Sequence, residues 1–167
     1  EGDRLIEAGS DYNFIQIGRD RLEEFTEFVF DNFVRGIGRH QSWQPTALDY
    51  TIMLAEERAF FENGIYVAAE SPAGQLLAAV RVARWPKNSL LKTERVFRIR
   101  LSSLAHEWQV NQRAIWHFSQ LCVDHEAIQR RELPASAGLR MMRGLFRCMM
   151  HVGQHFEARY GIMEIDD

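Results

Sequence analysis

The chain has 167 residues, of which 46% are hydrophobic and 26% are charged, a size and composition typical of one globular domain with its own core. Its formal net charge of −3 gives no chain-wide attraction for nucleic acid or for an anionic membrane surface. No uninterrupted apolar run approaches the roughly 18 residues of a membrane-spanning helix, so we expect no membrane span.

The amino-terminal part of the chain predicts a strand followed by a helix. Residues 12–17, YNFIQI, alternate between apolar and polar side chains as a half-buried strand does. Asp20 and Glu23 are spaced as a capping pair that starts a helix, and the apolar residues after them recur every three or four positions. Gly36 and Gly38 are expected to end this helix, whose phenylalanines we place in the core.

A second helix and a hairpin follow. The helix is predicted over residues 47–62. Residues 65–70, IYVAAE, and 75–85, QLLAAVRVARW, are apolar and enclose the turn sequence SPAG, which is typical of a hairpin. Residues 87–113 carry alternating arginines and apolar residues and predict only one short helix, around residues 103–110.

The carboxy-terminal part predicts a strand, a crossover helix and a second strand. Residues 115–124, IWHFSQLCVD, form the first strand, residues 139–161 the amphipathic helix, and residues 162–167, IMEIDD, the second strand. Strands joined by a crossover helix lie parallel, and the N–H groups at the start of such a helix form an anion site. We therefore expect a mixed sheet with antiparallel pairs early and a parallel pair late.

The cysteines and the chain ends bear on compartment and completeness. Cys122 falls in a predicted core strand and Cys148 in a predicted core helix, so we expect two free buried thiols and a reducing, cytoplasmic compartment. The polar start has no signal-peptide pattern. The chain begins without methionine and stops at Asp167, after an apolar strand-like run. Since a domain rarely ends inside its sheet, we expect residues 1–167 to form a single domain that lacks its last strands.

Three short stretches, in this order of elements, resemble a known family. Residues 119–124, SQLCVD, are similar to a strand signature in which Ser-Arg is followed by two apolar residues, Val and Asp. Residues 80–82, VRV, are similar to the second hairpin strand of the same family, and residues 95–101, RVFRIRL, to the segment that follows. The chain therefore resembles the GNAT acyltransferases, and more narrowly the branch that contains acyl-homoserine-lactone synthases and bacterial N-acyl amino acid synthases.

This resemblance implies an α/β (α+β) fold, a GNAT-like mixed central sheet with helices on both faces. It implies an N-acyltransferase that moves an acyl group from a thioester, on CoA or on acyl carrier protein, to a small amine such as an amino acid. No metal is expected. Two other interpretations stay open: a GNAT-like binding or regulatory domain without catalysis, and an unrelated α+β domain with a chance likeness.

The resemblance also implies a donor site. In the GNAT fold the strands that flank the long helix splay apart, the pantetheine arm pairs with the first strand, and the phosphate sits on the loop before the helix. Here the strand carries Leu121 and Val123, and the loop is residues 129–138. The usual GNAT loop has a glycine at its fourth place, which this loop lacks, so a solvated basic loop is the alternative. The candidate phosphate ligands are its arginines and small residues, namely Arg130, Arg131, Ser136, Ala137 and Gly138, with Arg140 nearby.

Amine acylation needs a base and donors for the tetrahedral oxyanion. The synthase branch places a glutamate two residues before the strand serine and an arginine just after it, and here those positions hold His117 and Gln120. His117 is a candidate base because an imidazole titrates near neutrality, and Gln120 is a candidate hydrogen-bond donor. The alternative for His117 is a structural strand histidine.

Further candidates lie elsewhere in the chain. Arg81 ends a core strand and is a candidate ligand for a substrate carboxylate, and Tyr160, near the end of the long helix, is a candidate acid for the leaving thiolate. His151 and His155 share a helix face, but no third metal ligand is evident, so we predict no metal site. The methionines of the long helix are core residues that are also candidates to wall an acyl tunnel, among them Met142, Met149 and Met150.

Overall fold

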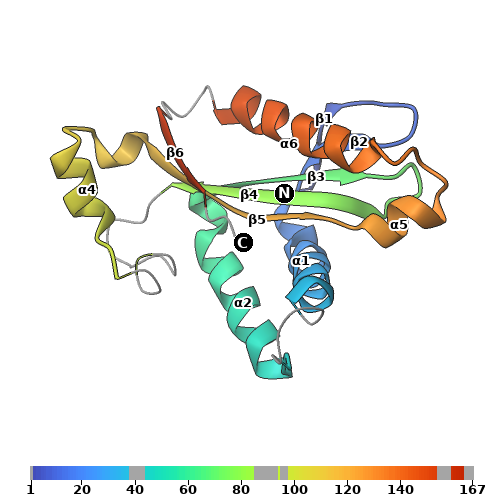
Figure 1. Ribbon diagram of the computed structural model, residues 1–167, viewed down its shortest axis with the longest axis horizontal. Coiled ribbons are helices and arrows are strands. Elements are labelled where there is room, and N and C mark those ends of the chain that lie inside the picture. Colours follow the sequence, from blue (N-terminus) through green and yellow to red (C-terminus); the bar gives the residue numbers. More distant parts are fainter. Residues whose placement is uncertain (1, 38–43, 85–93, 95–97, 154–158, 164–167) are drawn as a thin grey trace.

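The computed structural model describes residues 2–37, 44–84, 94, 98–153 and 159–163 (Figure 1). Within these residues, six strands form one sheet whose order follows the chain. The strands are β1 (Arg4–Glu7), β2 (Asn13–Gln16), β3 (Gly64–Glu70), β4 (Leu76–Arg84), β5 (Ile115–Val123) and β6 (Tyr160–Met163). Each neighbouring pair is antiparallel except β5 and β6, which are parallel. The predicted mixed sheet and the late parallel pair are confirmed.

Helices cover both faces of the sheet. In Figure 1, α1 (Leu22–Ile37) and α2 (Ala47–Phe60) lie on one face and α6 (Ala137–Gly153) on the other. The short helices α4 (Leu101–Glu107) and α5 (His125–Arg130) lie at opposite ends of the sheet. Short 3₁₀ turns precede α1, follow α2 and precede β5, at Arg19–Arg21, Phe61–Asn63 and Gln112–Ala114.

The central strands are buried on both faces, which explains their continuous apolar sequences. Along β3, Ile65 and Val67 belong to the core beneath α6, whereas Tyr66 and Ala68 belong to the core beneath α1. The α6 helix approaches the sheet closely at Gly144, where a Cβ atom would overlap the ring of Phe14 on β2. A glycine is therefore required at this contact.

The structure corrects one predicted helix start and adds a cap to another. The segment before α1 begins with a 3₁₀ turn whose N-cap, Gly18, makes no side-chain cap hydrogen bond, so the predicted Asp20–Glu23 capping pair is wrong. The α2 helix does begin with a capping box, formed by Thr46 and Asp49. The side chain of Thr46 accepts from the backbone N–H of Asp49, and the Asp49 carboxylate accepts from the backbone N–H of Thr46.

The ends of the predicted elements also change. The described part of the long helix runs to Gly153, and Tyr160 begins β6, so the prediction that places Tyr160 in the long helix is wrong. Gly161 lies directly against the ring of Phe118, a contact between strands that helical periodicity cannot reveal. Strand β1 was not predicted because it is short and exposed, with Leu5 58% exposed. The predicted final strand extends to residues 164–167, which lie outside the described residues.

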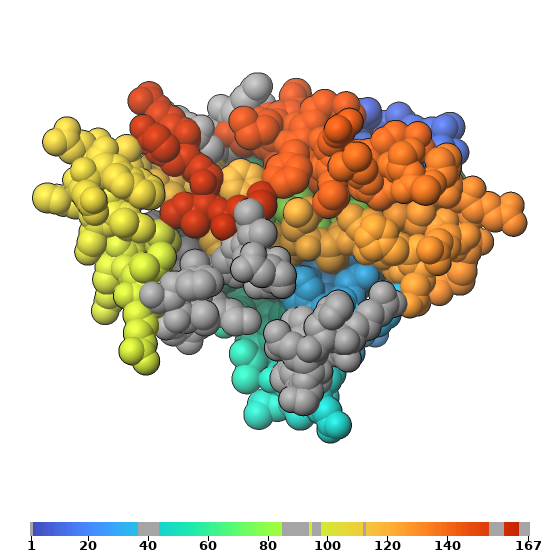
Figure 2. Space-filling view, in the orientation of Figure 1, coloured from blue at the N-terminus to red at the C-terminus, as the bar shows by residue number. Residues whose placement is uncertain are grey.

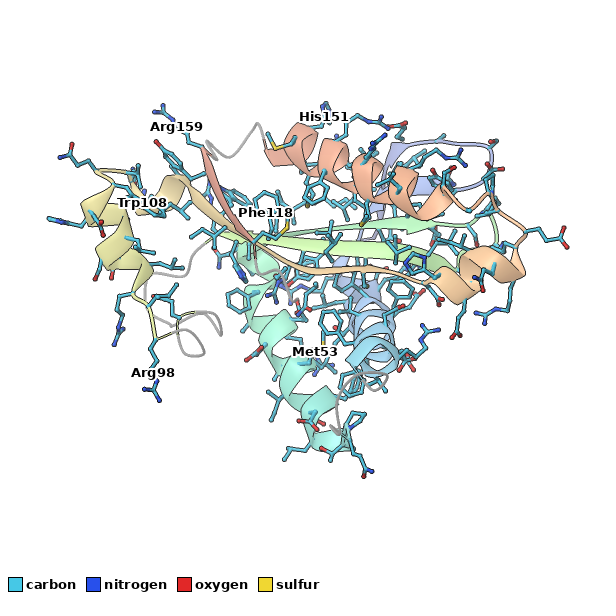
Figure 3. All side chains as sticks on the ribbon, viewed as in Figure 1. Met53, Arg98, Trp108, Phe118, His151 and Arg159 are labelled. Atoms are coloured by element: carbon cyan, nitrogen blue, oxygen red, sulfur yellow. The ribbon has the colours of Figure 1, made fainter. Side chains whose placement is uncertain are left out.

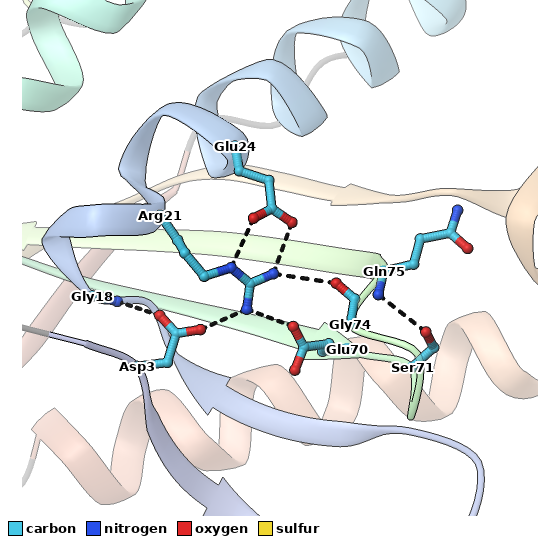
Figure 4. Close-up of polar contacts among 8 residues, drawn as sticks. All are labelled: Asp3, Gly18, Arg21, Glu24, Glu70, Ser71, Gly74 and Gln75. Carbon is cyan, nitrogen blue, oxygen red and sulfur yellow. Dashed lines mark hydrogen bonds and ion pairs between the residues drawn. The ribbon is translucent and has the colours of Figure 1, made fainter.

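Arg21 ties the amino-terminal segment to the rest of the fold (Figure 4). Its guanidinium donates to Asp3 at 2.6 Å, to Glu24 at 2.7 Å and to Glu70 at 2.5 Å. It also donates to the backbone oxygen of Gly74 in the β3–β4 turn. These hydrogen bonds, first of all those to Glu24, raise the pKa of Arg21. One side chain therefore joins the segment before β1, the start of α1 and the hairpin.

Candidate functional site

A β-bulge interrupts the pairing of β5 with β4. Arg81 pairs with Ser119 and Ala79 with Cys122, so Gln120 and Leu121 together lie opposite Val80. The backbone of Gln120 is left-handed, with φ of 58°, a conformation that costs a residue with a Cβ atom roughly 1–2 kcal/mol. The bulge lies within the SQLCVD stretch and is the most irregular point of the strand.

The bulge changes the face that β5 presents to each core. Before it, Trp116 and Phe118 pack in the core beneath α6; after it, Leu121 and Val123 do. The spacing of three residues between Phe118 and Leu121 breaks the alternation of a regular strand. That break was visible in the sequence and could have predicted the bulge. Its result is that Ser119 and Gln120 both reach groups on the α2 side.

A buried polar cluster lies beside the bulge. Glu57 of α2 is fully buried, and Arg81 of β4 is 5% exposed. Arg81 donates to the Glu57 Oε1 atom at 2.6 Å and, through Nε, to the Ser119 hydroxyl at 3.0 Å. The Gln120 side-chain amide donates to the same Glu57 oxygen at 2.8 Å. A single carboxylate oxygen therefore links α2, β4 and the bulge of β5.

Aromatic rings complete the surroundings of this cluster. The guanidinium of Arg81 lies 4.9 Å from the centroid of the Phe60 ring, and the Tyr66 hydroxyl donates to the backbone oxygen of Glu57 at 3.1 Å. Burial, the largest single cause, would lower the pKa of Arg81, but the groups around it, first the Glu57 carboxylate, together raise the pKa, so Arg81 is charged. Burial, followed by the charge of Glu57, raises the pKa of Tyr66, which is therefore a neutral donor.

Glu57 was not among the residues predicted from the sequence. Among the described positions of α2, the buried side chains are those of Leu54 and Glu57, which lie one helical turn apart. A carboxylate on the apolar side of an amphipathic helix is a detectable signal, because buried charges are nearly always paired. The irregular apolar pattern of this helix concealed it.

The structure brings some predicted catalytic residues together and separates another. Arg81 and Gln120 meet at Glu57. His117 is 4% exposed and pairs with Ala83, two positions from the Arg81–Ser119 pair, so it shares their face of the sheet. Tyr160 pairs with Ile115 at the far end of β5, roughly 16 Å along the strand from Gln120. It is 47% exposed and does not join the cluster.

The pairing of β5 with β6 is described only as far as Phe118. Strand β6 pairs with β5 from Ile115 to Phe118, where the described part of β6 ends at Met163. In the described chain no strand pairs with this edge of β5 from Ser119 to Val123, and these residues are half-buried. Figure 2 shows atoms of β5 at the surface between α6 and α1. An open strand edge of this kind can pair with an extended ligand.

The predicted loop before α6 contains the unpredicted helix α5. Asp124 caps α5 by accepting from the backbone N–H of Ala127 at 2.9 Å, and its carboxylate pairs with Arg35 of α1 at 3.0 Å. An aspartate directly after a strand is a recognised N-cap signal, which the reading of this segment as a loop missed. The salt bridge fixes the end of β5 relative to α1.

The small residues at the start of α6 allow close packing. Ala137 and Gly138 are buried, and a Cβ on Gly138 would lie 3.2 Å from the His125 ring and 3.4 Å from Val123. The backbone N–H of Ala137 donates to the carbonyl of Pro134 at 2.7 Å and is not available to a ligand. Ser136 is exposed just before the helix. The start of α6 therefore lies next to the open edge of β5.

Three arginines near the start of α6 could bind an anion, and two of them already have protein partners. Arg130 is exposed and lies 3.8 Å from the Glu126 carboxylate, and Arg131 donates to the side chain of Gln75 at 2.9 Å. Arg140 is exposed in the first turn of α6. The charge available to an anion here comes from these three side chains.

Two hollows accompany the site. The larger, about 510 Å³, lies between α1 and the β3–β4 turn, where Glu24, Glu27 and Asp31 line it together with Arg35 and Asp124. The smaller, about 60 Å³, is apolar and lies between the sheet and the carboxy-terminal half of α6. Its lining includes Ile65, Val82, Trp116, Phe118, Met149 and Met150.

No group of three His, Cys, Asp or Glu side chains that could hold a metal ion occurs in the described part of the chain. His151 points away from the sheet into solvent (Figure 3), and His155 lies outside the described residues. None of the described helices is both long and apolar enough to cross a membrane.

Both cysteines are free thiols, as expected, and we predict that both are unreactive at neutral pH. Burial raises the pKa of Cys122 to about 12 and that of Cys148 to about 11. Because the folded state favours the neutral thiol, this contribution to stability is complete below the ordinary thiol pKa of about 8.5 and is lost as the pH rises toward these values. Iodoacetamide at pH 8, followed by mass spectrometry, should modify the unfolded chain and leave the folded chain unmodified. Rapid alkylation of the folded protein would contradict the prediction.

No protein-family model matches the sequence, and no curated protein matches it. Solved structures do resemble it. A predicted acetyltransferase from Clostridium acetobutylicum, solved with acetyl-CoA, is 9% identical with a TM-score of 0.60, over 93% of this chain and 82% of its own. A Trypanosoma brucei acetyltransferase is 12% identical with a TM-score of 0.50, over 94% and 84%. A mutant Bacillus halodurans protein is 15% identical with a TM-score of 0.51, over 92% and 83%.

These similarities identify the fold. The strand order, the helices on both faces and the late parallel pair are those of the GNAT acetyltransferase fold, as the sequence predicted. Identities of this size carry information about the fold and none about the substrate.

Proposed function

We propose that this chain is an N-acyltransferase that moves an acyl group from a CoA thioester to a small amine. The observation that carries the proposal is the half-buried stretch of β5 from Ser119 to Val123, which contains the bulge and leads to the start of α6 in a GNAT fold. The backbone at Leu121 and Val123 would pair with the pantetheine arm, and Arg130, Arg131 and Arg140 would attract the phosphates. The similar structure solved with acetyl-CoA supports CoA as the donor.

The proposed reaction needs no group beyond donor and acceptor. The amine nitrogen attacks the thioester carbonyl carbon, a C–N bond forms, and the C–S bond breaks to release the CoA thiolate. The amine loses a proton, for which His117 is the candidate base, and the thiolate gains one from solvent, because Tyr160 pairs with Ile115 and lies too far along β5 from the bulge to supply it. The bulge of β5 leaves one residue unpaired with β4, so a backbone N–H there is a candidate oxyanion donor.

Arg81 has a different role in this proposal from the one expected for it. Its guanidinium is engaged by Glu57 and Ser119 and is almost fully buried. We therefore propose that Arg81 stabilises the structure of the site, and that another group binds the carboxylate of an amino acid acceptor.

The small volume of the apolar hollow beneath α6 is our reason for proposing that the acyl group is short. A volume of about 60 Å³ equals roughly two liquid water molecules at about 30 Å³ each. Met149 and Met150, two of the methionines named as candidates to wall an acyl tunnel, are among its lining residues. Within this proposal the acceptor is an amino acid or a related amine, as in the N-acyl amino acid synthase branch, and acyl carrier protein is the alternative donor.

A thiol-release assay tests the proposal. Acetyl-, butyryl- and octanoyl-CoA, and the same acyl groups on acyl carrier protein, would be offered with a panel of amino acids and small amines. We expect thiol release that depends on the amine and is fastest with the short chains. Release that ignores the amine would indicate thioester hydrolysis, and no release with any donor would refute the enzyme.

A second candidate function is a GNAT-like binding domain without catalysis. The burial of His117 favours it, because a base that is 4% exposed must become accessible before it can take a proton from a substrate. Isothermal titration with acetyl-CoA separates the two candidates. Binding without turnover over the whole amine panel would select the binding domain.

Arg140 gives a matched test of the donor site. Arg140→Gln is expected to weaken acetyl-CoA binding about 3- to 10-fold, since a charged contact to phosphate contributes on the order of 1 kcal/mol. Arg147→Gln is the control, because Arg147 lies two turns further along the exposed side of α6 and pairs with Glu7 at 2.7 Å. Titration calorimetry at two salt concentrations measures both. Equal losses in the two variants would place the phosphates elsewhere.

A further inference from the structure

We propose that Glu57 is a positioning residue of this site: its carboxylate holds Gln120 in the left-handed conformation that creates the bulge of β5. The inference rests on the proposed acyl transfer for its functional consequence. Its structural part, that Glu57 sets the backbone of residue 120, stands apart from any activity.

The contact between Glu57 and Gln120 links residues far apart in the chain. The Gln120 side-chain amide donates to the Glu57 Oε1 atom at 2.8 Å, and the backbone of Gln120 has φ of 58°. A side chain with a Cβ atom disfavours this backbone region, so something must offset the cost. A hydrogen bond to a buried carboxylate is stronger than one between neutral groups, and this bond forms only when Gln120 is directed toward α2.

Glu57 is itself held in one place. Arg81 donates to the same oxygen at 2.6 Å, Tyr66 donates to the Glu57 backbone oxygen at 3.1 Å, and the side chain is fully buried. A carboxylate fixed by a charged partner and by packing on all sides cannot follow Gln120 if the strand straightens. The strand therefore has to adapt to the carboxylate.

The bulge matters for function because of where it lies. It falls between Ser119 and Cys122 in the register with β4, at the start of the half-buried stretch of β5 with which no described strand pairs on the side away from β4. The extra residue of a bulge leaves the ladder, which frees backbone groups near the thioester of the proposed donor. Loss of the bulge would return Gln120 to the α6 side and reverse the faces of Leu121 and Val123.

Substitutions of Gln120 test the inference while they keep the Glu57–Arg81 pair intact. Gln120→Ala and Gln120→Gly both remove the contact with Glu57, but glycine adopts a positive φ without strain. We expect kcat with acetyl-CoA to fall at least 10-fold in Gln120→Ala and to be at least 5-fold higher in Gln120→Gly than in Gln120→Ala. Equal losses in the two variants would mean that the glutamine side chain acts directly, and would overturn the positioning role.

Glu57→Gln completes the test in two backgrounds. In the natural chain it is expected to lower kcat about 10-fold with little change in KM for acetyl-CoA, and in the Gln120→Gly background to lower it less than 2-fold. The same loss in both backgrounds would overturn the inference. If Glu57→Gln does not fold, the pair of Gln120 variants decides alone.

Backbone chemical shifts of residue 120, measured by NMR, separate this inference from the proposed function. The shifts in the natural chain should indicate a positive φ, and those of Glu57→Gln or Gln120→Ala an extended one. This measurement requires no activity, so it stands even if the chain transfers no acyl group. A positive φ retained in both variants would refute the positioning role.

Discussion

Replacing Gly144 by alanine is expected to lower the free energy of unfolding by about 2–3 kcal/mol. An alanine normally stabilises a helix relative to glycine by about 1 kcal/mol, but here its Cβ would overlap several ring atoms of Phe14. Phe14 is 5% exposed in the core beneath α6, so its ring cannot move aside without displacing neighbours. Thermal unfolding should show a Tm lower by roughly 4–12 °C.

Gly153 provides the control for this substitution. It lies in the last turn of the same helix, and a Cβ there would meet nothing within 4 Å. Gly153→Ala is therefore expected to leave the Tm unchanged or to raise it slightly. In the double variant Phe14→Leu with Gly144→Ala, the smaller side chain should recover part of the loss. A Tm that rises in Gly144→Ala would show that α6 sits further from the sheet.

Replacing Arg81 by methionine is expected to cost about 3–5 kcal/mol of stability, because it leaves the Glu57 carboxylate buried without its charged partner. Methionine retains most of the length of the side chain, so the loss reports on charge more than on volume. Chemical denaturation at neutral pH measures the loss.

The surrounding charges supply the controls for Arg81. Arg58 is next to Glu57 on α2, its side chain is 63% exposed, and it lies 3.4 Å from the Glu23 carboxylate. Arg58→Met should therefore cost less than about 1 kcal/mol. Arg81→Met combined with Glu57→Gln should be more stable than Arg81→Met alone, because the unpaired charge is gone. If the double variant is no more stable, the destabilisation comes from packing around Phe60 and not from charge.

The parts of the fold that follow from local sequence were predictable. The bounds of β5, the β3–β4 hairpin and the crossover to a parallel strand all come from runs whose side chains alternate or recur at helical spacing. That Tyr160 belongs to a strand was not predictable in this way, because the sequence up to Gly161 also fits a helical pattern. What assigns Tyr160 to a strand is pairing with Ile115, a contact between distant residues.

The site was predictable where it lies on one strand and hidden where it depends on tertiary contacts. His117 and Gln120 were identified as candidates because they lie on the predicted strand that contains SQLCVD, and the break in alternation at Leu121 could have indicated the bulge, although it was not used. The partnership of Gln120 with Glu57 joins positions 63 residues apart. The residue pattern within α2 or β5 does not predict this contact, which forms only because α2 packs on the sheet.

The sequential order of the strands has a consequence for amide hydrogen exchange. Each strand pairs only with its neighbours along the chain among the described residues, so β3 and β4 lie at the centre with a partner on both sides, whereas β1 borders the sheet. Amides of β3 and β4 can exchange only when the whole domain unfolds, and those of β1 by local opening. The protection factors of Val67 and Val80, both fully buried, should therefore report the global stability of the domain.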